Sequence, residues 1–189
     1  MYDSLIERRS MGQQELLRKL REEISSGPMN EREFWKAPEL SSGIARGIVA
    51  ELIGNASSEY LLEVFRMHPE HFIFWCDKSP RLNAAAVSQR GIKLSRIKFI
   101  TTEKDLGPTL RIAFEGGQFY PFIVAPSYTS DIKTLQRYHL LAQKSKSTLF
   151  LLADKKLSSA WPISLQLEIN FSGEGFDVTI HRQKHGIGK

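Results

Sequence analysis

Short apolar runs alternate with segments of helical period through the middle of the chain. The apolar runs lie at 47–53, 71–76, 97–101, 119–125 and 147–153, and four of them are apolar at nearly every position. Strands that are buried on both faces of a sheet have this pattern. Segments with apolar residues three and four apart fill the intervals, at 57–67, 81–89, 108–116 and 130–145. The alternation predicts a three-layer α/β domain with a mostly parallel sheet flanked by helices.

Residues at the ends of these helical segments support the assignment. Ser57 or Ser58 is suited to the N-cap of the first helix, and Gly91 to the C-terminal end of the second. Pro108 favours the first turn of the third helix, and Asp131 suits the positive end of the fourth. We therefore expect each helix to begin and end close to these residues.

The pattern changes after Pro162. Apolar and polar residues alternate strictly from 163 to 171, a turn-forming SGEG follows, and the sequence FDVTIHR alternates again. This predicts an antiparallel β-hairpin over 163–183 that extends one edge of the sheet. The α/β domain then covers 47–189.

Residues before 47 have a different character. Residues 1–27 predict an amphipathic helix, and 28–46, with two prolines, predict a linker. The apolar face of this helix either packs on the protein's own core or docks on a partner protein. The adjacent aromatic residues of the linker, Phe34 and Trp35, also need a surface that covers them. The candidate partner contacts are Leu16, Leu17, Leu20, Ile24, Phe34 and Trp35.

The formal net charge is +5 over 189 residues, and the excess of basic residues lies after residue 130. A basic cluster at a strand end could bind the phosphates of a nucleic acid without recognising its base sequence. The alternative is that the charged residues at the chain end are simply exposed to solvent. The candidate DNA or phosphate contacts are Lys155, Lys156, Arg182, Lys184 and His185. They imply weak binding of single-stranded DNA at most.

Several classes of protein are disfavoured. No apolar run approaches 18 residues, and no apolar stretch follows the charged N-terminus, so neither a membrane span nor a secretory signal is predicted. The single cysteine, Cys76, lies in an apolar run, where a buried small side chain is expected. The histidines have no metal-ligand spacing, and no G-x-S-x-G elbow follows a strand. We expect a cytoplasmic protein without metal or cofactor.

The segment after the first apolar run occupies the place of a nucleotide-binding P-loop. Such a loop needs G-x-x-x-x-G-K-[ST] between a strand and a helix, so that backbone N–H groups, a lysine and a hydroxyl hold phosphate and magnesium. Here the octapeptide consists of Gly54, Asn55, Ala56, Ser57, Ser58, Glu59, Tyr60 and Leu61. Glu59 would repel a triphosphate, and Leu61 cannot bind a metal, so the loop is degenerate.

The order of segments resembles the core of the RecA recombinases. GIVAELIGNASS matches that family's first strand and the first half of its loop. The resemblance places Lys78 where the family has a catalytic glutamate, Ala125–Pro126 where its Walker B aspartate ends a strand, and Asp154–Lys155 where it has asparagine–glutamine. Four lost catalytic features on a retained apolar scaffold imply a pseudo-enzyme.

Within this group the chain is most similar to the ImuA family, small RecA-like proteins of bacterial mutagenesis cassettes. The shared features are FWKAPEL, the GxxxE[LI] strand, the degenerate loop and the terminal ISLQLEINF–turn–FDVTIHRQKHG hairpin. The resemblance implies an accessory role in translesion synthesis during the SOS response to DNA damage. The implied partners are the recombinase RecA, an ImuB-like protein and an error-prone polymerase, and a homo-oligomer is a further expectation.

Two alternatives remain open at this point. The cell-division inhibitor SulA is another shortened relative of this fold, so the fold alone does not fix the pathway. An enzyme that binds nucleotide with an unconventional loop is the second alternative.

Overall fold

The structure is a computed structural model that describes residues 33–79, 82–102, 105–127, 131–156 and 162–184. The expected N-terminal helix, with Leu16, Leu17, Leu20 and Ile24, lies outside the described residues, and so does His185. The described residues belong to one compact unit, 33–189.

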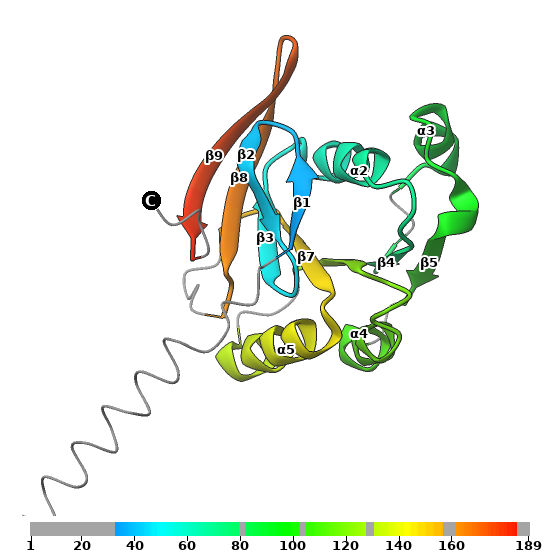
Figure 1. The fold of residues 1–189 in the computed structure, drawn as a ribbon, viewed down its shortest axis with the longest axis vertical. Helices are drawn as coiled ribbons and strands as arrows, with labels where there is room; N and C mark the ends of the chain where they lie inside the picture. Colours follow the sequence, from blue (N-terminus) through cyan, green and yellow to red (C-terminus); the bar gives the residue numbers. More distant parts are fainter. Residues whose placement is uncertain (1–32, 80–81, 103–104, 128–130, 157–161, 185–189) are drawn as a thin grey trace, which may run out of the picture. The chain divides into compact units, whose positions relative to one another are not determined.

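A seven-stranded sheet forms the centre of this unit (Figure 1). Its strands, in spatial order, are β5 (Ile97–Thr101), β4 (Ile73–Asp77), β6 (Phe122–Pro126), β7 (Thr148–Ala153), β3 (Val49–Ile53), β8 (Leu165–Ser172) and β9 (Gly175–Gln183). The first six strands pair in parallel, and β8 pairs with β9 in antiparallel fashion. The mostly parallel sheet and its terminal hairpin, both predicted from the apolar pattern, are confirmed.

Helices cover both faces of the sheet. They are α2 (Ser57–Met67), α3 (Ala84–Gln89), α4 (Leu106–Glu115) and α5 (Ile132–Ser145), with a 3-10 turn at Leu94–Arg96. One core cluster joins α2 to the side chains of one sheet face, and a second joins α4 and α5 to the other. Figure 1 shows α4 and α5 side by side below the sheet, with α2 on the opposite side. The central strands β3, β4, β6 and β7 therefore bury alternate residues in two different cores, which explains their continuous apolar runs.

The caps differ in part from the predicted ones. Asp131 caps α5 and accepts the Thr134 N–H at 2.9 Å, as expected. Helix α4 begins at Leu106, ahead of Pro108, because Asp105 supplies its N-cap. Ser57 is already helical, so the predicted serine N-cap of α2 is wrong.

Residues 33–46 are not an extended linker. Strands β1 (Phe34–Ala37) and β2 (Leu40–Ala45) form a separate two-stranded antiparallel sheet, which we name the N-terminal ribbon. Glu39 sits in its tight turn with a left-handed φ of 54°. Pro38, one of the two prolines that suggested a linker, lies in the turn between the strands, where proline is common.

Trp35 anchors the N-terminal ribbon to the main sheet. Its side chain is 3% exposed, and its indole N–H donates to the Thr148 hydroxyl at 2.9 Å. The guanidinium of Arg46 lies 4.3 Å from the ring centroid, in cation–π geometry. Trp35 is therefore a core residue rather than a free partner contact, whereas Phe34 remains 38% exposed.

Cys76 lies inside the core, as predicted, with 1% of its surface exposed. Burial, and secondarily the charge of Asp77, raises the pKa of its thiol to about 11. Among the described residues, no helix combines the length and apolar character needed to cross a lipid bilayer.

Replacement of Trp35 by alanine should lower the free energy of unfolding by about 3–5 kcal/mol, because a buried ring and its hydrogen bond are lost together. The matched control is Phe34→Ala, which truncates the exposed neighbour and should cost about 1 kcal/mol or less. Urea denaturation followed by circular dichroism measures both values. Equal losses for the two variants would contradict the anchoring role of Trp35.

Iodoacetamide at pH 8 should leave Cys76 unmodified in the folded protein and alkylate it fully in urea. A thiol with a pKa of about 11 is ionised in roughly one molecule in a thousand at that pH, and burial blocks access to it. Intact-mass spectrometry over time measures the reaction, with free glutathione as the internal reference. Alkylation of the native chain at the rate of glutathione would disprove the burial of Cys76.

Candidate functional site

The carboxyl ends of the central strands surround a cleft of about 480 Å³, which we name the carboxyl-edge cleft. Its lining includes Gly54, Ser57, Ser58 and Glu59 after β3, Asp77 at the end of β4 with Lys78 after it, Pro126 at the end of β6, and Asp154 after β7. The loop after β3 and the three other positions that the resemblance aligned with RecA motifs are far apart in the sequence. The structure brings all four to one place.

The connections of the sheet explain the position of this cleft. Strands β4 and β6 are neighbours, but the chain leaves β4 towards β5 on one side and leaves β6 towards β7 on the other. Divergent connections of this kind open a crevice at the carboxyl ends of the strands, where ligands of open α/β sheets bind.

The loop from β3 to α2 is short and tied to β8. Only three residues separate Ile53 from Ser57, and the N–H of Ala56 donates to the carbonyl of Ile169 at 3.2 Å. Gly54 has φ of +102°, and a Cβ there would lie 2.3 Å from the same carbonyl oxygen. The backbone is thus closed onto the sheet instead of being wrapped around an anion.

The two residues at the lysine and hydroxyl positions of the P-loop pattern face the core. Tyr60 and Leu61 are both fully buried. The Tyr60 hydroxyl donates to the carbonyl of Pro38 at 2.8 Å, which fastens α2 to the turn of the N-terminal ribbon. Burial is the main reason that the pKa of Tyr60 is raised above its ordinary value. Neither side chain reaches the carboxyl-edge cleft.

Glu59 has a partner that the sequence did not suggest. Its carboxylate lies 2.5 Å from the guanidinium of Arg90, which also donates to the carbonyl of Ala86 at 2.8 Å. The pair joins the first turn of α2 to the end of α3, both half-exposed at the mouth of the cleft. No spacing rule connects residues 59 and 90, so only the packing of the two helices identifies Arg90.

The charge of the cleft is unsuited to a nucleoside triphosphate. Three carboxylates, Glu59, Asp77 and Asp154, line it beside one lysine. The Asp77 carboxylate accepts the N–H of Lys78 at 2.7 Å, which holds it at the end of β4. Glu59 is paired with Arg90, and the other two carboxylates leave the lining acidic beside Lys78. Carboxylates close to a phosphate oppose its binding. Within the described part of the chain, no group of His, Cys, Asp or Glu side chains has the geometry to hold a metal ion.

The predicted basic contacts do not form one cluster. Exposed Lys155 and Lys156 follow β7 at the carboxyl edge of the sheet. Arg182 and Lys184 lie at the opposite edge, because β9 runs antiparallel and its end pairs with the start of β8. These four candidate residues therefore lie in two places, and their contact with phosphate stays a prediction.

Comparison with known proteins identifies no relative: neither a protein-family model nor a curated protein sequence matches the chain. The geometry of the carboxyl-edge cleft and of the turn beside it therefore carries the functional inference.

Replacement of Gly54 by alanine should destabilise the protein by about 1–3 kcal/mol or more, because the positive φ and the contact with the Ile169 carbonyl both oppose a Cβ. Gly173→Ala is the matched control, since a Cβ at that exposed hairpin turn meets nothing within 4 Å. Its effect should stay within about 0.5 kcal/mol. Thermal and urea denaturation compare the variants, and a neutral Gly54→Ala would refute the tight turn.

Proposed function

We propose that this protein is a non-catalytic, RecA-like accessory protein that acts in the cytoplasm through contacts with other proteins. One observation carries the proposal: the loop in the P-loop position is used by the fold itself. The Ala56 N–H is taken by β8, and Tyr60 and Leu61 are buried in the core. A turn that gives this N–H to β8 and buries the side chains at its lysine and hydroxyl positions lacks the cation and the metal ligand of a P-loop.

The convergence of the four motif positions supports the RecA-like part of this proposal. Gly54, Lys78, Pro126 and Asp154 line one cleft, as expected if their alignment with a nucleotide-binding fold is right. The acidic lining of the same cleft argues against the alternative of an unconventional nucleotide-binding enzyme.

The resemblance to the ImuA family supports a pathway for these contacts. We infer a role in translesion synthesis after DNA damage, with the recombinase RecA, an ImuB-like protein and an error-prone polymerase as partners. Any contact with single-stranded DNA is weak, since the basic residues predicted for it lie at two opposite edges of the sheet.

Titration of ATP with Mg²⁺ into the full chain should give no heat of binding by isothermal calorimetry, because the loop presents no phosphate cradle. An active recombinase titrated in the same buffer is the positive control. Magnesium-dependent binding at micromolar affinity would overturn the non-catalytic proposal and favour the enzyme alternative.

Pull-down with the immobilised full chain separates the two pathways. We expect purified RecA recombinase to be retained and the tubulin-like division protein, the target of a SulA-type inhibitor, to pass through. Retention of the division protein alone, or of neither protein, would contradict the proposed role in mutagenesis.

A further inference from the structure

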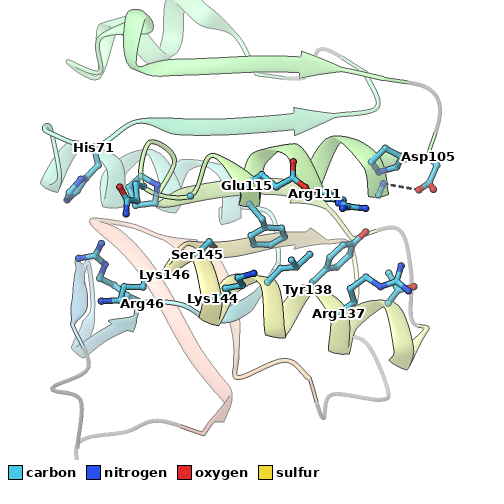
Figure 2. A pocket seen from close by; sticks show the side chains of 18 residues that line it. Arg46, His71, Asp105, Arg111, Glu115, Arg137, Tyr138, Lys144, Ser145 and Lys146 are labelled. Carbon is cyan, nitrogen blue, oxygen red and sulfur yellow. Dashed lines mark hydrogen bonds and ion pairs between the residues drawn. The ribbon is translucent and has the colours of Figure 1, made fainter. Parts of the chain in front are cut away.

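Helices α4 and α5 form the walls of a groove of about 1350 Å³ on the face of the sheet that carries them (Figure 2). Its floor is apolar. The rings of Phe114 and Tyr138 lie with centroids 6.2 Å apart and are each 3% exposed, and Leu141 is partly buried beside them. The groove is long and open, which suits a chain segment better than a small molecule.

Basic side chains predominate along this α4–α5 groove. Its charged lining consists of Arg46, Arg111, Arg137, Lys144 and Lys146, against Asp105 and Glu115. The two carboxylates already have partners. Asp105 accepts the N–H of Gly107 at 2.9 Å, and Glu115 accepts from Arg111 at 3.0 Å. The field in the groove is therefore positive.

The positive charge is concentrated on one wall. On the α4 side Arg111 is neutralised by Glu115, and near the ribbon Arg46 is paired with Glu33. Along α5, the sequence from 132 to 145 contains no acidic residue. Within the described residues no ion pair engages Arg137, Lys144 or Lys146, and all three are exposed. Figure 2 shows Arg137 and Lys144 on the α5 side of the groove.

Several large apolar side chains that adjoin lining residues in the sequence are exposed. Ile112 of α4 and Leu140 of α5 are each 65% exposed and adjoin lining residues in the sequence. Phe119 is 71% exposed, with its ring centroid 6.4 Å from that of Phe72. An exposed apolar surface of this kind marks a site of protein association.

We propose that the α4–α5 groove binds an acidic amphipathic helix of a partner protein. The apolar stripe of that helix covers Leu141 and the exposed aliphatic side chains of the two crests, and its carboxylates face Arg137 and Lys144. These two residues are seven apart, which places them about 10.5 Å from each other along α5, so carboxylates two turns apart on the partner match them.

Single-stranded nucleic acid fits the groove less well. A strand of phosphates needs unpaired cations along its track and exposed aromatic rings on which bases stack. Here Arg111 on the α4 wall is neutralised by Glu115, and the two rings of the floor, Phe114 and Tyr138, are each only 3% exposed, so bases cannot stack on them. The inference concerns a different surface from the carboxyl-edge cleft, and it stands whether or not the proposed pathway is correct.

Phage display of a random 16-residue peptide library on the full chain tests the inference. We expect the enriched peptides to carry net negative charge, with apolar residues three and four apart. Fluorescence anisotropy with the labelled consensus peptide should show affinity at least about tenfold weaker for the double variant Arg137→Glu, Lys144→Glu. Both residues are exposed, so circular dichroism should show an unchanged fold.

The matched control is Lys93→Glu, Lys98→Glu, which makes the same change in net charge at exposed positions near and on the edge strand β5, outside the groove. It should bind the consensus peptide within about twofold of the unaltered chain. Failure to enrich acidic amphipathic peptides, or equal losses for the two double variants, would overturn the proposal. Tighter binding of a 20-nucleotide oligo(dT) that displaces the peptide would assign the groove to nucleic acid instead.

Discussion

The turn between β3 and α2 constrains much of the rest of the structure. It spans three residues and is closed by the carbonyl of Ile169, which accepts the Ala56 N–H. Because the turn is so short, α2 begins at once and directs Tyr60 into the core, where its hydroxyl reaches Pro38. One tight connection thus links the main sheet, the terminal hairpin and the N-terminal ribbon.

The same constraint bears on the proposed lack of a nucleotide site. A phosphate cradle requires backbone N–H groups that are free of internal partners. In this chain the Ala56 N–H of the turn donates to the carbonyl of Ile169 in β8. The carboxyl-edge cleft next to the turn is lined by three carboxylates. The charge distribution is also uneven: the cleft is acidic, whereas the groove between α4 and α5, on one face of the same sheet, is basic. The net charge of +5 is therefore a poor guide to either site.

The apolar pattern predicted the main elements because central strands of a parallel sheet are buried on both faces. Each such strand is therefore a continuous apolar run that can be recognised from its own residues. The pattern did not predict the N-terminal ribbon. Trp35 and its neighbours lie between prolines, and the Thr148 hydroxyl that receives the indole N–H is more than a hundred residues away. The local pattern also did not show that the basic residues after β7 and at the end of β9 lie at opposite edges of the sheet, since that depends on the antiparallel return of β9.

The sequence by itself determined the parallel sheet, the terminal hairpin and the absence of the second glycine, the lysine and the hydroxyl of a P-loop pattern, since these depend on residue type and local period. Tertiary structure alone decided where those positions meet, that Tyr60 points inward, that Glu59 pairs with Arg90, and that two separate helices enclose a basic groove. The physical reason is that ion pairs and hydrogen bonds form between groups that are close in space, whatever their separation in the sequence. The strand order of the sheet sets those distances, and no local pattern records that order.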